Sequence, residues 1–384
     1  MISSGSQSYS RRIASSYLLY RGELLRNGVV EVDAVGKILS VGSVERIDSL
    51  CNTEFFAGVM FAGMVNAHCH LELSHLKGVV SEQCGFASFA EQLSSSRDSF
   101  SEADVARAIA QGDVDMRREG VVAVGDISNS CSSLIVKASS PIHYHTFAEH
   151  FGLRRSSSDH LAELLAAPNV SLTPHSVYSV SDRCFRAIAS QRSAAPLSIH
   201  FMETPSEGEL FERRGELWEW YRKVGFECDF LHYGSPARRI VESVPKDRSV
   251  MLVHNVSVAK ADIELIMNHF SAPVYWVVSP RSNRYISGLK PPLSLLRSMG
   301  LNICVGTDSL SSNHSLSMVD ELRAMEGIPL VERLEWATKV GAAALNLDHL
   351  GEVEVGRRPS LLVLSGVDFE RDEIGSRCRI EKIV

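Results

Sequence analysis

The sequence lacks the features that mark a secreted, membrane-bound or disulfide-stapled protein. Its eight cysteines are scattered over 384 residues and form no CxxC pair, a pattern typical of free thiols in a reducing compartment. Residues 1–10 are rich in serine and lack the apolar core of a signal peptide. No segment approaches the ~20 apolar residues that a membrane span needs. We therefore expect a soluble cytoplasmic protein with no membrane partner.

Charge of one sign is not concentrated anywhere either. The 39 basic and 46 acidic residues are interspersed, and they give a formal net charge of -7. Without a run or stripe of Lys and Arg, a nucleic-acid partner is not expected. The chain is 45% hydrophobic, and its length suits one α/β barrel of roughly 250 residues plus a small accessory domain.

The two ends of the chain are rich in short β-like segments. Residues 17–20, 28–32 and 37–41 are separated by glycines, and similar segments return at residues 360–364 and 379–384. We predict that residues 1–57 and 350–384 pair into one small β-sandwich domain.

The middle of the chain, residues 58–349, alternates apolar β-rich runs with helical stretches. The runs lie at residues 60–67, 121–126, 142–149, 170–173, 196–200, 249–254, 274–279 and 301–307. Helical spacing of apolar residues occurs at residues 103–118, 261–270 and 331–345. Eight strands alternating with helices predict a parallel (β/α)8 TIM barrel, of class α/β. Ser101 is a candidate N-cap, and the serine-rich segment 93–101 is predicted to be a loop, either a solvated connector or a lid.

The segment Asn66-Ala-His-Cys-His70 ends the first predicted barrel strand. Alternate side chains of a strand share a face, so His68 and His70 are expected to point the same way. Neutral imidazoles are good ligands for zinc and similar metals. Such a pair is weak evidence when taken alone.

Other polar residues follow the ends of later strands. They are His200, Glu203, His254 and Asp308. Because barrel active sites form at the C-terminal ends of strands, we expect all of them at one rim with the histidine pair. Taken singly, His200 has the alternative of a hydrogen-bonded structural role, and Glu203 that of an acid at a helix N-terminus.

This set suits metal-assisted hydrolysis. A catalytic zinc site keeps one position for water and lowers the pKa of that water to about 7. Asp308 can take the proton from this water, Glu203 can deliver a proton to the leaving group, and His254 can orient the water and share its proton.

The chain resembles the amidohydrolase superfamily, in its branch of cytosine, guanine, adenosine-type and chloro-triazine aminohydrolases. The match runs from Phe61-Ala-Gly-Met-Val-Asn-Ala-His-Cys-His-Leu-Glu72 through Val305-Gly-Thr-Asp-Ser-Leu-Ser-Ser-Asn313 to the last β segment, and so covers nearly the whole chain. The resemblance implies one divalent metal ion, most simply Zn²⁺, with Fe²⁺ and Mn²⁺ also acceptable. Its implied ligands are His68, His70, His200 and Asp308. It also implies Glu203 as the proton shuttle to the leaving group and His254 as the partner of the attacking water.

The region after the fourth strand reads Leu172-Thr-Pro-His-Ser-Val-Tyr178. Binuclear members of the superfamily have a metal-bridging lysine there, so the resemblance implies a mononuclear site. It also implies that His175 faces the substrate. A structural histidine after a proline turn is the alternative.

The Pro280-Arg-Ser-Asn283 segment and the Leu71-Glu-Leu-Ser74 continuation of the histidine motif are most similar to aminodeoxyfutalosine deaminase-like sequences. Arg281 would then meet an anionic end of the substrate. Glu72 lies two residues past His70, on the same face if the strand continues, and is expected to reach a polar group of the substrate. A solvated cation and a solvated carboxylate are their respective alternatives. Ser279 differs from the His-Cys-Pro or Cys-Pro pattern of many relatives, with an effect on the pocket that the sequence does not fix.

The sequence therefore predicts a mononuclear metal-dependent aminohydrolase. Attack of metal-bound hydroxide would deaminate an amino-substituted heterocycle that is purine-like, with an adenine nucleoside derivative among the candidates. A small-molecule substrate is the expected partner, and a homodimer is common among the proteins it resembles. The alternatives are a non-deaminating or dechlorinating hydrolase with the same site, or a barrel that binds metal or ligand and has lost turnover.

Overall fold

The computed structural model describes residues 10–46, 51–152 and 158–384. The first nine residues, over which the sequence predicts no signal peptide, lie outside this part. None of the helices in the described ranges is both long enough and apolar enough to span a bilayer.

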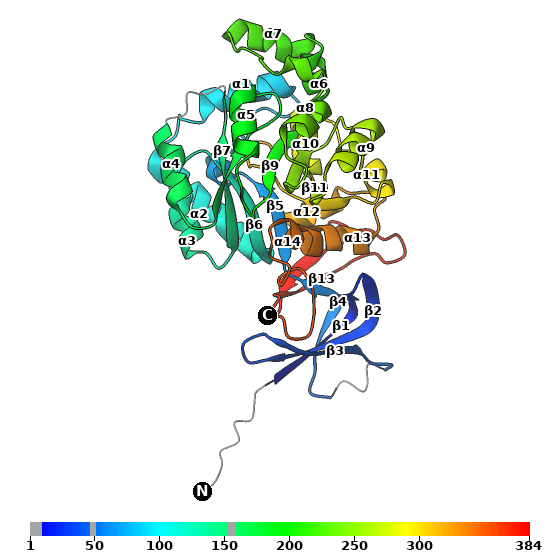
Figure 1. Ribbon diagram of the computed structural model, residues 1–384. Helices are drawn as coiled ribbons and strands as arrows, with labels where there is room; N and C mark the ends of the chain where they lie inside the picture. Colours follow the sequence, from blue (N-terminus) through cyan, green and yellow to red (C-terminus); the bar gives the residue numbers. More distant parts are fainter. Residues whose placement is uncertain (1–9, 47–50, 153–157) are drawn as a thin grey trace.

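Both ends of the chain contribute to one small mixed sheet, drawn in blue and red at the bottom of Figure 1. Its strands are β1 (Ser10–Tyr20), β2 (Glu23–Asp33), β3 (Ile38–Ser43), β4 (Glu54–Ala62), β13 (Leu361–Ser365) and β14 (Arg379–Lys382), in the order β14-β13-β4-β1-β2-β3. The ends meet where β4 pairs with β13. The predicted boundary at residue 57 remains a prediction, and β4 runs past it.

The central strands form two parallel four-stranded sheets. These are β5 (Met64–Cys69), β6 (Val121–Ser128), β7 (His143–His150) and β8 (Val170–Pro174), then β9 (Leu197–Phe201), β10 (Val250–His254), β11 (Val274–Val278) and β12 (Asn302–Val305). They correspond to the eight predicted runs.

The two sheets join at both seams and close the barrel. At one seam, β12 meets β5, where Thr307 N and Asp308 N both donate to His68 O at 3.0 Å. At the other seam, β8 meets β9, where His200 N donates to His175 O at 2.9 Å. Inside the barrel pack Val65, Ala123, Phe147, Met251, Val253, Val277 and Cys304. This confirms the predicted α/β barrel, and its seams carry candidate site residues.

One predicted strand is wrong in its extent. The apolar run at residues 60–67 contains the end of β4 and the start of β5, so it serves two sheets. The break falls at Gly63, where an added Cβ would lie 2.3 Å from Val122 Cγ1. The chain turns there against β6, which only a residue without a side chain allows.

The helices surround the barrel (Figure 1). They are η2 (Leu71–Leu76), α1 (Phe86–Ser96), α2 (Glu102–Arg118), α3 (Leu134–Ser139), α4 (Ser158–Ala166), α5 (Asp182–Ala189), α6 (Pro205–Phe211), α7 (Gly215–Val224), η3 (Leu231–Tyr233), α8 (Pro236–Ser243), α9 (Lys260–His269), α10 (Pro280–Ser287), α11 (Leu293–Ser298), α12 (Met318–Arg323), α13 (Leu330–Glu335), the π-helical turn η4 (Trp336–Val340) and α14 (Gly341–Ala344). The predicted helices at 103–118 and 261–270 correspond to α2 and α9, and the one at 331–345 to α13, η4 and α14.

The predicted loop at residues 93–101 is wrong over its first part. Residues 93–96 form the last turn of α1, where Ser95 Oγ donates to Gln92 O at 3.0 Å and so satisfies its hydroxyl within the helix. The end of the segment behaves as predicted, since Ser101 Oγ accepts from Asp104 N at 3.2 Å and caps α2.

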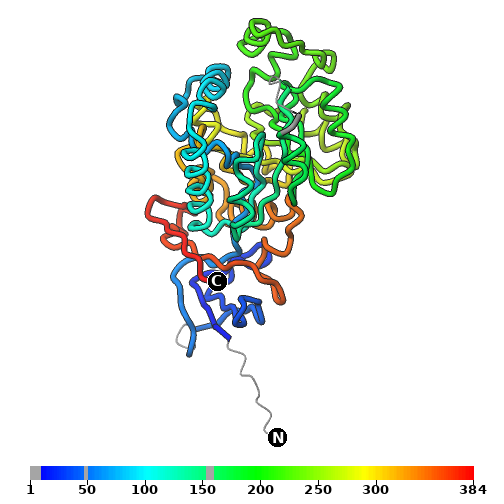
Figure 2. The backbone as a smooth tube through the Cα atoms, turned by 90° about the vertical axis from the view of Figure 1, so that its left-hand side faces the viewer, coloured from blue at the N-terminus to red at the C-terminus, as the bar shows by residue number. Residues whose placement is uncertain are grey.

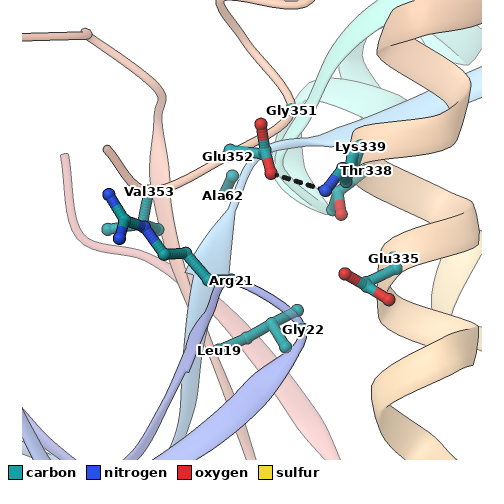
Figure 3. A pocket seen from close by; sticks show the side chains of 10 residues that line it. All are labelled: Leu19, Arg21, Gly22, Ala62, Glu335, Thr338, Lys339, Gly351, Glu352 and Val353. Carbon is teal, nitrogen blue, oxygen red and sulfur yellow. Dashed lines mark ion pairs between the residues drawn. The ribbon is translucent and has the colours of Figure 1, made fainter. Parts of the chain in front are cut away.

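The small sheet lies at the end of the barrel where the strands begin, because a single residue, Gly63, separates the end of β4 from the start of β5 (Figures 1 and 2). A crevice between the two is lined by charged side chains, among them Arg21, Glu335 and the Lys339–Glu352 ion pair at 3.0 Å (Figure 3). The rim at the other end, where the strands finish, is the end near α1 and α7.

Candidate active site

Four predicted metal ligands converge at the C-terminal rim of the barrel. The Nε2 atoms of His70 and His200 lie 3.3 Å apart. Asp308 Oδ1 lies 3.7 Å from His68 Nε2 and 3.5 Å from His70 Nε2. All four residues are buried. Ring nitrogens and a carboxylate oxygen that face one another at these distances have the arrangement of ligands around a shared cation.

Local backbone features aim these side chains. Asp308 has φ of 58° and His254 has φ of 84°, a left-handed region that residues with a Cβ rarely adopt. Such strain persists where surrounding structure enforces it, and it concentrates at functional sites. Gly306 lets β12 approach β5, because an added Cβ there would lie 2.8 Å from His68 Cβ. The strained turn at Asp308 and the close seam together place the carboxylate that follows β12 against the histidines at the end of β5.

Hydrogen bonds outside the cluster fix the orientation of two ligands. Asp308 Oδ2 accepts from Ser282 Oγ at 2.5 Å and from Ser312 Oγ at 2.8 Å, which leaves Oδ1 toward the histidines. His200 Nδ1 lies 2.9 Å from His175 O. A carbonyl only accepts, so Nδ1 carries the proton and the Nε2 lone pair faces His70. Sequence reasoning missed both serines, although Ser282 lies within the Pro-Arg-Ser-Asn segment.

Glu203 and His254 stand beside the cluster. Their side chains approach to 3.7 Å, measured from Glu203 Oε1 to His254 Nε2. The Asn283 amide nitrogen lies 3.0 Å from His254 Nδ1 and donates to it, so Nε2 carries the proton of the neutral ring. Glu207, which sequence reasoning also missed, accepts hydrogen bonds from Met202 N at 2.8 Å and Glu203 N at 2.7 Å and so holds the turn that carries Glu203.

Burial and neighbouring charges shift the pKa values of the titratable groups in different directions. Burial, with Asp308 and Glu207 nearby, raises the pKa of Glu203 well above its ordinary value. Burial lowers the pKa of His254 to about 3, which keeps this ring neutral. Burial alone would raise the pKa of Asp308, but His70, His254 and the Ser282 hydrogen bond hold it below its ordinary value. The opposite directions of these two pKa shifts favour an acid at Glu203 and a base at Asp308 within the same site.

The predicted substrate-facing histidine lies in this cluster. The ring of His175 stacks on that of His200, with centroids 4.5 Å apart and planes at 21°. Its Nδ1 is 2.7 Å from Ser179 Oγ, which holds the ring in place.

Glu72 and Arg281 have protein partners. Glu72 is buried, forms an ion pair with Arg97, and accepts from the backbone amides of Asn129 at 3.2 Å and Ser130 at 3.0 Å. Its carboxylate is therefore not solvated. Arg281 Nη1 donates to Ser315 Oγ at 2.8 Å and lies 3.4 Å from Asp320 Oδ2. Their contacts with a substrate remain predictions.

The residues present fit a divalent metal ion. Both ring nitrogens of His68 are buried and have no hydrogen-bond partner within the described part of the chain, a state that is rare unless a ligand satisfies it. His68, His70 and Asp308 form one group able to hold a cation, and His68, His200 and His254 form another. Three imidazoles and a carboxylate suit zinc and its first-row neighbours.

Comparisons with known proteins agree with this geometry. The model of the amidohydrolase family matches residues 59–382. Adenosine deaminase from Helicobacter pylori is 29% identical over 357 residues, which cover 85% of this chain and 85% of the relative. The crystal structure of aminofutalosine deaminase from Helicobacter pylori, in complex with methylthio-coformycin, has a TM-score of 0.77 and 26% identity and covers 93% of each chain.

A further crystal structure, that of an adenosine deaminase from Xanthomonas campestris with bound zinc, has a TM-score of 0.71 and 20% identity. It covers 92% of this chain and 84% of that chain, and at this identity it supports the fold alone. The comparisons confirm the resemblance and the fold predicted from the sequence.

Proposed function

The chain belongs to the amidohydrolase family, and we propose that it deaminates an adenine nucleoside derivative with the help of one divalent metal ion. The observation that carries this proposal is the meeting of His70, His200 and Asp308 at one rim. The relatives named adenosine deaminase and aminofutalosine deaminase support the substrate class. Together with the family they confirm the prediction of a hydrolase that acts on carbon–nitrogen bonds.

We infer that the metal is zinc and that its ligands are His68, His70, His200 and Asp308. When bound, such an ion acts as a Lewis acid and makes water a strong nucleophile at neutral pH.

The eight cysteines are free in the structure, which supports a reducing compartment such as the cytoplasm.

The neighbouring residues would move the protons of deamination. His254 donates from Nε2 to the oxygen of the attacking water and so orients it toward the carbon that bears the amine. Asp308, as the ionised group, accepts the proton that the water loses. Glu203, as the protonated group, delivers its proton to the ring nitrogen next to that carbon.

The same residues complete the step. Asp308 returns its proton to the amine, which leaves as ammonia. Glu203 takes up the remaining hydroxyl proton as the carbon–oxygen double bond forms. The net change is the addition of one water and the loss of one ammonia, and both side chains return to their starting states.

The test is ammonia release by metal-replete protein across adenine, guanine, cytosine and pterin derivatives, with adenine nucleosides and carboxylate-bearing adenine nucleosides included. We expect release from adenine nucleosides, and its loss in Glu203→Gln while the metal stays bound. The matched control is Glu335→Gln, the same change in the crevice at the far end of the barrel (Figure 3). If the metal-bound protein releases no ammonia from any compound of the panel, the barrel has no deaminase activity toward these substrates.

A further inference from the structure

Glu149, at the end of β7, has one carboxylate oxygen without a hydrogen-bond partner in the described part of the chain. Phe147 lies in the barrel interior, so Glu149, two residues later on the same strand face, points into the barrel mouth. The residue is only 6% exposed. Asn129 Nδ2 donates to its Oε2 at 3.0 Å. Its Oε1 is buried and has no hydrogen-bond partner among the residues that the structure describes.

The nearest polar group does not satisfy this oxygen. His200 Nδ1 lies 3.6 Å from Glu149 Oε1, and its proton is directed to His175 O at 2.9 Å instead. A buried acceptor left unpaired loses its hydrogen bonds to water without replacement, so native proteins rarely leave one without a ligand. A donor on a bound substrate would satisfy it.

We propose that Glu149 Oε1 accepts a hydrogen bond from a sugar hydroxyl of the substrate, and thereby selects ribonucleosides over their deoxy forms. This inference rests on the proposed function. Within the described residues no donor reaches Oε1, so what this oxygen lacks is a donor on the substrate. Apart from its exocyclic amine, the adenine ring of a nucleoside offers acceptor nitrogens alone. The amine must face the reacting groups, so the sugar hydroxyls are the donors that remain.

The layout of the rim agrees with this division of the substrate. The strands follow one another as β7, β8, β9 and β10, so His200 on β9 lies between Glu149 and His254 along the rim. The rings of His175, His200 and His254 stack in that order, with centroids 4.5 Å and 5.3 Å apart. In the proposed complex, the reacting amine lies beside His254 and Glu203. Glu149 Oε1 lies on the opposite side of His200, where the sugar of the substrate would bind.

A different role for Glu149 is support of a metal ligand through His200. When a carboxylate that orients a metal-binding histidine is removed, the affinity of the protein for the metal typically falls. Metal content therefore separates this role from a contact with the sugar, and it is measured on every variant.

The experiment compares the best adenine nucleoside of the panel with its 2′-deoxy and 3′-deoxy forms, in the wild type, Glu149→Gln, Glu149→Ala and the control Glu335→Gln. With the ribonucleoside, we expect both Glu149 variants to raise KM by about 10- to 100-fold, as for a lost hydrogen bond to a charged acceptor. We expect kcat to stay within about threefold, since this contact is made equally in the ground and transition states. With the deoxy form that lacks the contacting hydroxyl, the variants and the wild type should perform alike.

Two results would overturn the inference while the proposed function stands. One is an equal rise in KM for the ribonucleoside and for both deoxy forms, which would show that Glu149 contacts the adenine ring rather than the sugar. The other is loss of metal in Glu149→Gln, which would show that Glu149 orients His200 as a metal ligand. Silence of the wild type toward every adenine nucleoside would instead overturn the proposed function, and with it the sugar contact.

Discussion

The carboxylate of Glu207 accepts a hydrogen bond of 2.7 Å from the backbone amide of Glu203, four residues earlier in the chain. It also accepts from the amide of Met202, whose φ of 49° turns the chain sharply after β9. Glu207 is fully buried on α6, so a helix holds the proposed proton shuttle in place.

Replacing Glu207 therefore tests whether the position of Glu203 matters. We expect Glu207→Ala to lower kcat by about 100-fold, the effect of a displacement of about 1 Å in a reacting group, with metal content unchanged. Two buried amides would also lose their acceptor, at a cost of ~1–3 kcal/mol in the free energy of unfolding for each. Steady-state kinetics, metal analysis and urea unfolding measure the three quantities. An unchanged kcat in a folded variant would show that Glu207 does not position the shuttle.

Two serines donate hydrogen bonds to Asp308, and removing one of them is predicted to lower the affinity for the metal. Ser282→Ala removes one of the two donors to Oδ2, and we expect metal affinity to fall by roughly 10- to 100-fold, as for other groups that orient a ligand. Competition with a chelator measures it. Ser287→Ala is the matched control on the same helix, because Ser287 Oγ donates to the backbone oxygen of Asn283 and accepts from Leu289 N, and neither partner belongs to the metal cluster. Equal affinities of the two variants would contradict the role assigned to Ser282.

Glu321 predicts how stability depends on pH. Burial raises the pKa of this carboxyl from its ordinary value of 4.5 to about 8 in the folded protein. Between these values the folded state holds a proton that the unfolded state has lost, so stability decreases as pH rises and levels off above pH 8. The slope contributed by this group is at most roughly 1 kcal/mol per pH unit.

Glu321→Gln checks this sign, since it removes the titrating group. We expect the free energy of unfolding of metal-saturated protein, measured between pH 5 and pH 8 by denaturant titration, to fall less steeply in the variant. A wild type that becomes more stable over this range, with the variant unchanged in slope, would be inconsistent with a protonated Glu321.

The sequence predicted the barrel because its signals are local. Each strand is an apolar run, and the histidines and carboxylates come within a few residues of the strand ends, where the chain must reach one rim. The same local signals failed at residues 60–67, since an apolar run gives no sign of which sheet it joins, and at residues 93–96, where serine composition suggested a loop.

The contacts that orient the site were not predicted because they join distant parts of the chain. Ser282 reaches Asp308 over 26 residues, and Arg97 reaches Glu72 over 25. No spacing rule links such pairs. Glu149 is different, since the two-residue alternation from Phe147 along β7 would have placed its side chain in the barrel.

The central claim is that one metal ion at His68, His70, His200 and Asp308 supports deamination. The most direct measurement is a titration of chelator-treated protein with Zn²⁺, in which ammonia release from an adenine nucleoside is followed against zinc bound per chain. We predict that the rate rises linearly and reaches its plateau at one zinc per chain. No ammonia at any zinc occupancy, or a plateau only at two, would contradict the account.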